Sequence, residues 1–217
     1  LGEWIAEEQS HSTLLYLYGL HSGLLGKYID LSEYQKAKDR QLITGMDVEI
    51  RGLAQGFSYL SLQEDATGIS HDNLAWLLDP SGRHAVRKMS GDEYRHRDFY
   101  ASLVRALLEV DPDTTLASIA WQFDEKNFHM PGRIGIENFD EMAKVIAFAG
   151  VLDLAQLRKA KYGLLTKKWK IQDLHPHSDS GKAAQAKLLA DNDHHSQSAL
   201  KADQRVSNIR ERILARS

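Results

Sequence analysis

The sequence predicts an all-α fold, and three observations support that prediction. The chain has 217 residues and only four prolines, none before Pro80, so a long opening segment lacks the residue that costs about 3 kcal/mol inside a helix. Within that segment, one helical face is marked by residues at alternating spacings of four and three, namely Trp4, Glu8, His11, Leu15 and Tyr18. No stretch alternates apolar and polar residues with a period of two, so we expect a helical bundle without strands.

The expected helices follow one another along the chain, with glycine and proline between them. The first contains the residues above, and its pattern weakens at Gly19, Gly23 and Gly26. Turn signals stand at Asp79-Pro80-Ser81-Gly82, Asp111-Pro112-Asp113 and Met130-Pro131-Gly132. Later helices are expected over Ser32–Ile43, Leu53–Leu78, Arg83–Val110, Ile136–Ala149 and Leu154–Lys170. Another helix is expected between Val110 and Ile136; Thr114 or Thr115 can cap it, and it runs to about Phe128.

Composition and charge exclude several classes of protein. The 27 basic and 30 acidic residues give a net charge of −3, which argues against a nucleic-acid binder with its usual basic excess. The absence of cysteine excludes disulfides, a thiol nucleophile and a cysteine-ligated zinc or iron–sulfur site. The longest apolar runs, such as Leu14–Tyr18, are too short to span a membrane. The composition is typical of a soluble globular protein.

Two Glu-x-x-His steps, Glu8/His11 and Glu93/His96, carry the strongest chemical signal. Residues three apart lie on one face of a helix, so each step can direct a carboxylate and an imidazole to the same point. Both steps fall within long helical patterns, where a buried charged pair needs a partner. Surface Glu–His pairs at helical spacing are the alternative interpretation.

Glu64 adds a third carboxylate between two largely apolar stretches, Phe57–Leu62 and Ile69–Leu78. Di-iron carboxylate bundles take one Glu from each of two helices and Glu-x-x-His from each of two others, so three of the four parts are present. Carboxylates are hard anions that can bridge two iron ions, and neutral imidazoles complete each ion without adding charge. The pattern therefore favours a di-iron centre. Surface Glu–His pairs at helical spacing remain the alternative interpretation.

Other histidines give weaker signals. His71 follows Glu64 by seven residues and shares its helical face, so it is either a residue behind the metal ligands or an ordinary core or surface histidine. Asp191 and His194 repeat the acid-x-x-His spacing, but in a polar stretch where we expect a solvated loop.

Several short motifs occur together in a characteristic order. They are Trp4-Ile-Ala-Glu-Glu-Gln-Ser-His11, Gly45-Met46-Asp47, Gln63-Glu64-Asp65-Ala66-Thr67 with Ile69-Ser70-His71, Asp92-Glu93-Tyr94-Arg95-His96, Met130-Pro131, and a C-terminal set of Trp169-Lys170-Ile171, Asp173-Leu174, Gly181-Lys182 and Ala184-Gln185. From Trp4 to about Leu189, this set resembles the soluble acyl-ACP desaturases, the plant stearoyl-ACP desaturase family and its bacterial relatives.

That resemblance implies a helical homodimer built on a ferritin-like bundle. Such enzymes activate O2 at a di-iron centre of two Fe2+/Fe3+ ions and insert a cis double bond into fatty acyl chains carried on acyl carrier protein. Reduced ferredoxin is the implied electron donor, and fatty acid biosynthesis is the implied context. The implied location is the cytoplasm for a bacterial protein and the plastid stroma for one from a plant or alga.

By matching position, the resemblance implies five metal ligands. Glu8 and Glu93 would bridge the two iron ions, His11 would bind one ion, and Glu64 with His96 would bind the other. These roles come from the resemblance and not from spacing alone.

Thr67 matches a family threonine on the oxygen-binding side of the centre. Its hydroxyl would hydrogen-bond a bound oxygen species or relay a proton, which makes it the implied catalytic residue. An ordinary threonine on a helix face is the alternative.

The sequence departs from the family pattern at its start. The family's first ligand helix supplies a terminal Glu upstream of the Trp4 motif, and this sequence begins at Leu1. Glu3 and Glu7 do not have the helical position to replace it. We therefore expect the ion nearest His11 to lack a ligand, apolar surface to be exposed, and the isolated chain to bind iron weakly and turn over little.

We expect residues 1–170 to form a partial ferritin-like bundle and residues 171–217 a polar, partly helical C-terminal segment. That segment contains two candidate helices, Ala183–Leu189 and Asp203–Ala215. Because acyl carrier proteins are acidic, a docking surface should be basic. The densest basic cluster comprises Arg158, Lys159, Lys161, Lys167, Lys168 and Lys170, and a second comprises Arg83, Arg87 and Lys88. A solvated helix face is the alternative for each.

Two other functions stay open at this stage. A ferritin-like ferroxidase or iron-binding protein would use the same ligands without acyl chemistry, although the motif around Trp169 argues against it. A non-catalytic remnant of the desaturase, acting as a helical interaction protein, would lack the upstream helix altogether.

Overall fold

A computed structural model of the chain describes residues 2–27, 30–32, 35–36, 52–124, 127–128 and 139–191, together with 204, 207–208 and 211. These residues form helices and connecting turns with no strand among them, which confirms the all-α prediction. None of the helices in these ranges has both the length and the hydrophobicity that a bilayer crossing needs. The motifs Gly45-Met46-Asp47 and Met130-Pro131, and most of Ser32–Ile43 and Asp203–Ala215, lie outside the described residues.

Helix α1 (Gly2–His21) contains the predicted first helical face. It continues through Gly19, where the pattern was expected to weaken, and ends before Gly23. A short segment, α2 (Leu24–Lys27), follows after a turn. Gly23 and Gly26 have φ angles of 74° and 91°, in the region that residues with a Cβ rarely adopt. The predicted weakening of the helix at these glycines is confirmed.

Helices α4 (Leu53–Leu74) and α5 (Pro80–Val110) are the two longest elements and are joined by a 3-10 turn, η1 (Ala75–Leu77). The helix predicted over Leu53–Leu78 is confirmed, with a tightened last turn. Helix α5 begins three residues before its predicted start at Arg83. The reason is local, because Asp79 caps the helix by accepting a 2.9 Å hydrogen bond from the Gly82 amide and Pro80 occupies the first helical turn.

Helix α6 (Pro112–Gln122) corrects one prediction about capping. The cap is Asp111, whose carboxylate accepts a 3.1 Å hydrogen bond from the Thr114 amide, and not Thr114 or Thr115. The helix also ends before the predicted Phe128. The Asn127 side-chain amide folds back and donates a 2.9 Å hydrogen bond to the Trp121 carbonyl.

The second half of the chain contains α7 (Phe139–Phe148), α8 (Leu154–Gly163), a π-helical turn η3 (Leu164–Lys168) and a 3-10 turn η4 (Ile171–Asp173). The helix predicted over Leu154–Lys170 is present, but its last part widens into the π turn. A further helix covers residues 179–191, which extends the one predicted over Ala183–Leu189 and includes Asp191, expected in a loop.

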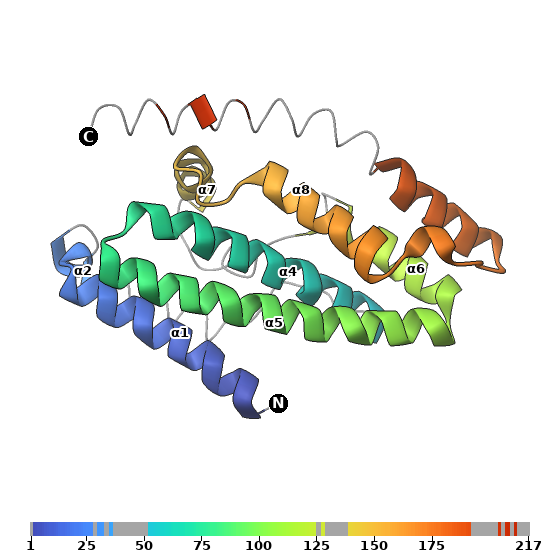
Figure 1. The fold of residues 1–217 in the computed structure, drawn as a ribbon, viewed down its shortest axis with the longest axis horizontal. Helices are drawn as coiled ribbons and strands as arrows, with labels where there is room; N and C mark the ends of the chain where they lie inside the picture. The colour runs from blue at the N-terminus through green and yellow to red at the C-terminus, as the bar shows by residue number, and fades with distance from the viewer. Residues whose placement is uncertain are drawn as a thin grey trace.

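The long helices lie side by side, with α5 between α1 and α4, and α8 above α4 (Figure 1). Glu7 of α1 contacts His96 of α5, and His11 contacts Glu93, so the two helices are antiparallel. Helices α4 and α5 are also antiparallel, because Asp65 contacts Arg97 and Gly68 contacts Ser90. The main core joins α4, α5 and α6 to the π turn and residues beyond it, including Val104, Ile119, Leu165, Ile171 and Leu188. Core residues thus come from both sides of residue 170, and the division into 1–170 and 171–217 stays a proposal.

Two glycines allow the close helix approaches that bring the polar faces together. A Cβ at Gly82 of α5 would lie 2.5 Å from the Tyr18 ring of α1, and one at Gly68 of α4 would lie 2.8 Å from the Tyr94 ring of α5. The Ser90 hydroxyl crosses the second contact and donates a 3.1 Å hydrogen bond to the Gly68 carbonyl. Helices α1 and α4 therefore both pack closely against α5.

The outer side of α1 keeps its apolar side chains exposed. Leu14, Leu15 and Leu20 are exposed by more than a third and Leu17 by about half. Helix α1 therefore presents several apolar side chains to solvent.

Candidate metal centre

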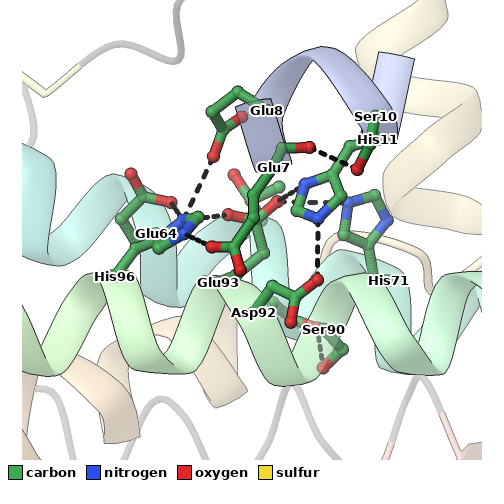
Figure 2. A network of polar contacts seen from close by, with 12 residues as sticks. Glu7, Glu8, Ser10, His11, Glu64, His71, Ser90, Asp92, Glu93 and His96 are labelled. Atoms are coloured by element: carbon green, nitrogen blue, oxygen red, sulfur yellow. Dashed lines mark hydrogen bonds and ion pairs between the residues drawn. The ribbon is translucent and has the colours of Figure 1, made fainter. Parts of the chain in front are cut away.

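The three packed helices bring the predicted ligands to one place. Helix α1 contributes Glu8 and His11, helix α4 contributes Glu64, and helix α5 contributes Glu93 and His96 (Figure 2). Four of the side chains are at least 94% buried, and Glu8 is half-buried. One donor atom each from Glu8, Glu64, Glu93 and His96 lie within 4.8 Å of one another, close enough to bind a single ion.

Glu93 occupies the centre of the group and faces both imidazoles. Its Oε1 lies 3.3 Å from His11 Nδ1, and its Oε2 lies 3.6 Å from His96 Nδ1. The two imidazole ring centroids are 6.4 Å apart. The carboxylate of Glu93 therefore lies between two potential nitrogen donors.

The inward-facing atoms give a test of whether a metal fits. Five buried atoms in the group have no hydrogen-bond partner: Glu8 Oε1, His11 Nδ1, Glu64 Oε2, Glu93 Oε2 and His96 Nδ1. Buried polar atoms are normally paired, because an unsatisfied one costs about 1–3 kcal/mol. These carboxylate oxygens and imidazole nitrogens face only one another, and together they form a donor set suited to iron and similar divalent ions. The residues present therefore fit a metal.

A second layer of acids fixes the orientation of both imidazoles. Glu7 Oε2 lies 2.8 Å from His96 Nε2, and Asp92 Oδ2 lies 3.1 Å from His11 Nε2. An ionised carboxylate only accepts hydrogen bonds, so each Nε2 carries a proton and each Nδ1 faces inward. This arrangement is the one in which metal-binding histidines are usually held.

Arg95 connects the two acids of this layer. Its guanidinium donates a 2.7 Å hydrogen bond to Glu7 and a 2.6 Å hydrogen bond to Asp92. The acid paired with each histidine belongs to the other helix, so the contacts run from α1 to α5 and back. The result is a continuous polar network that links the two Glu-x-x-His steps.

His71 lies beside the central carboxylate. Its Nε2 is 3.6 Å from Glu93 Oε1, the oxygen that also faces His11. Of the two interpretations of His71, its position favours a residue behind or beside the ligands.

Burial and mutual repulsion shift the ionisation of the group in the absence of metal. Burial, with the neighbouring Glu93, raises the pKa of Glu64 to about 10. Burial opposes ionisation of Glu93, but contacts from His11, His71 and Glu64 outweigh it and hold the pKa of Glu93 well below its usual range. The contact with Glu93, opposed by burial and supported by Asp92, raises the pKa of His11 to about 9. Protons on Glu64 and His11 thus offset part of the negative charge of the buried carboxylates.

Some functional contacts were missed at the level of sequence. The helical position of Glu7 excludes it as a replacement ligand, and the sequence pattern alone assigns no role to Asp92. A signal exists, because an acid directly precedes the Glu of both steps, as Glu7-Glu8 and Asp92-Glu93. Residues four apart share a helix face, so each acid lies on the same side as the histidine of its own step and reaches the histidine of the other.

Thr67 does not join this network among the described contacts. Its hydroxyl donates a 3.0 Å hydrogen bond to the Gln63 carbonyl and accepts a 3.2 Å hydrogen bond from the Gln63 side chain. Its catalytic role remains a proposal.

The fold and the donor set together define a class, that of helical bundles with a buried Glu/His cluster able to hold metal ions. Comparison with known families assigns the chain within that class. The family model described as "Fatty acid desaturase" matches residues 1–215, so the chain belongs to the fatty acid desaturase family, with its all-α ferritin-like fold.

Named relatives support the assignment. The chain is 32% identical over 195 residues to the chloroplastic stearoyl-[acyl-carrier-protein] 9-desaturase of Helianthus annuus, with 84% of this chain and 47% of the relative covered. It is 34% identical over 183 residues to stearoyl-[acyl-carrier-protein] 9-desaturase 3 of Arabidopsis thaliana, with 79% and 44% covered. The chain spans about half the length of the relatives it matches.

The variant Glu64→Gln tests whether this carboxyl is neutral without metal and anionic when it binds metal. With a pKa near 10, Glu64 is neutral at pH 7 without metal, so Glu64→Gln should change the melting temperature of the metal-free chain little. Affinity for Co2+ should fall about 100-fold, because the amide supplies no anionic ligand. Scanning calorimetry measures the melting temperature, and calorimetric titration measures the affinity for Co2+. Glu109→Gln, an exposed change on α5, is the control for both. Undiminished Co2+ binding by Glu64→Gln would contradict the ligand assignment.

Metal affinity should rise steeply between pH 6 and pH 8. The pKa values of Glu64 and His11 both lie above pH 8 in the metal-free chain, so both protons are present across this window and must leave when metal binds. Each proton released increases affinity about tenfold per pH unit. Co2+ titration at several pH values in buffers of different ionisation enthalpy measures the release. The slope should be smaller in Glu64→Gln, and an affinity that does not change with pH argues against the assigned protonation.

Proposed function

We propose that the chain is part of an acyl-[acyl-carrier-protein] desaturase that uses O2 at a di-iron centre to insert a cis double bond into an acyl chain carried on acyl carrier protein. The observation that carries this proposal is the convergence of two Glu-x-x-His steps and Glu64 with five unpaired inward-facing atoms, in a chain of the desaturase family. The names of the relatives supply the substrate class, since they are stearoyl-[acyl-carrier-protein] 9-desaturases.

The proposed roles of the residues follow from their positions. Glu93 faces both imidazoles and would bridge two iron ions, with Glu8 as the second bridge. His11 would bind one ion, and Glu64 with His96 the other. When bound, the di-iron pair supplies the oxygen activation that removal of hydrogen from an unactivated acyl chain requires.

The protein itself orients these donor atoms and limits the access of water to them. Glu7 and Asp92 hold the Nε2 sides of the imidazoles outward, so that the Nδ1 atoms face the centre. Trp4 stacks edge-on to His96 at 6.1 Å and to Tyr100 at 6.3 Å, and so covers one side of the centre with aromatic rings. Exclusion of water protects the reactive species that form during oxygen chemistry.

Acyl carrier protein and reduced ferredoxin are the proposed partners, and a homodimer is the proposed assembly. Thr67, one helical turn after Glu64, is the proposed residue for hydrogen bonding or proton transfer on the oxygen side.

The experiment is a paired measurement of iron binding and desaturation. The full product of the gene that encodes these residues is loaded with Fe2+ under argon and given stearoyl-acyl carrier protein, reduced ferredoxin and O2. Mass spectrometry should detect a monounsaturated acyl product. Glu93→Ala should abolish the product and the di-iron absorption, whereas Glu109→Ala, an exposed change on the same helix, should leave both unchanged.

Two outcomes would contradict the proposal. If Glu93→Ala retains the di-iron absorption, Glu93 is not a ligand. If the wild-type protein oxidises Fe2+ with O2 but neither binds acyl carrier protein nor alters the acyl chain, a ferroxidase is the better description.

A further inference from the structure

A cavity of about 410 Å3 lies between α4, α5, α8 and the π turn, apart from the metal centre. Its volume falls in the range of small-molecule sites, about 300–1,000 Å3. None of the five proposed metal ligands lines it. Its polar lining residues include Tyr94, Arg97, Gln156, Lys159, Lys167 and Lys168. The cavity is therefore a separate candidate site.

The acids in and around this cavity already have partners. Asp65, 97% buried, accepts a 2.7 Å hydrogen bond from Arg97. Asp98, beside the cavity, pairs with Arg97 at 2.8 Å and with Lys168 at 2.9 Å. The other lining acid, Asp72, accepts a 3.0 Å hydrogen bond from the Tyr94 hydroxyl.

Two lysines in the lining keep their positive charge uncompensated. Lys159 of α8 and Lys167 of the π turn have no acidic group within 4.0 Å in the described part of the chain. The lining holds four basic residues and two acids, a net charge of 4 − 2 = +2. A cavity with excess positive charge and satisfied acids attracts an anion.

The π turn explains how the lysines come to this place. In η3 (Leu164–Lys168) the helix widens, while Leu164 and Leu165 stay buried in the core. Both lysines of the turn, Lys167 and Lys168, then line the cavity. Single π turns within helices occur frequently at functional sites. The π turn is thus a second observation, independent of charge, that favours a functional site at the C-terminal end of α8.

We propose that this cavity binds a small organic oxyanion, a phosphate or carboxylate compound, with its charged end between Lys159 and Lys167. Lysine ammonium groups bind such ends as point charges. Gln156 offers a neutral hydrogen-bonding side chain, and Ile69, Ala160 and Leu164 give the organic body an apolar wall. The site is separate from the metal centre, because none of the proposed metal ligands lines it. Lys159 and Lys167 also belong to the basic cluster expected as a docking surface for acyl carrier protein.

The test uses the metal-free 217-residue chain and two probes, inorganic phosphate and citrate, at constant ionic strength. Calorimetry and amide NMR shifts should show saturable binding of at least one probe, with shifts at α8 and the π turn. Preference for phosphate assigns the phosphate class, and preference for citrate assigns the carboxylate class. The double change Lys159→Ala with Lys167→Ala should weaken binding about tenfold or more, because it removes both ammonium groups that hold the charged end.

The control removes the same charge elsewhere. Lys144→Ala with Lys182→Ala changes two exposed lysines outside the cavity and should leave the affinity unchanged. Lys159→Gln with Lys167→Gln serves as a second variant if the alanine variant has a lowered melting temperature. Absence of saturable binding of both probes, or equal weakening by the control, would overturn the proposal.

Discussion

The centre of this protein depends on the burial of several carboxylates against one another. Glu64 and Glu93 are each 98% buried, and Glu8 approaches them from a third helix. Like charges in a poorly solvated interior repel strongly, so the group must bind cations or protons. Without metal, the protons sit on Glu64 and His11, and a divalent ion can replace them. Metal binding and proton release are therefore coupled by the packing of α1, α4 and α5.

The network around Arg95 makes this burial compatible with a defined geometry. Each imidazole is held by the acid of the opposite helix, and Arg95 joins the two acids. Helix α1 thus attaches to α5 through polar contacts as well as through the packing of Tyr18 on Gly82. Its apolar side remains open, with Leu17 about half exposed. The position of Glu8 and His11 therefore relies on these hydrogen bonds as well as on packing.

Much of the fold could be predicted from sequence because its long helices carry periodic patterns and few breakers. The errors fall where a single local contact decides the boundary, as with Asp111 in place of Thr114 as a cap and with Asp79, which starts α5 early. The spacing of Glu8/His11 and Glu93/His96 indicated which residues could meet. It could not show that the acids cross between helices, because that depends on the antiparallel register of α1 and α5. The cavity beside the π turn was also beyond prediction, since it depends on how α8 packs on α4.

The central claim is that this cluster holds a pair of metal ions, and anomalous X-ray diffraction tests it most directly. Crystals of the full product of the gene that encodes these residues, grown with Fe2+ under argon, are measured above and below the iron absorption edge. We expect two anomalous peaks, one among Glu8, Glu64, Glu93 and His96 and one beside His11 and Glu93. Crystals with no peak in the cluster, or with iron bound only elsewhere on the chain, would contradict this claim.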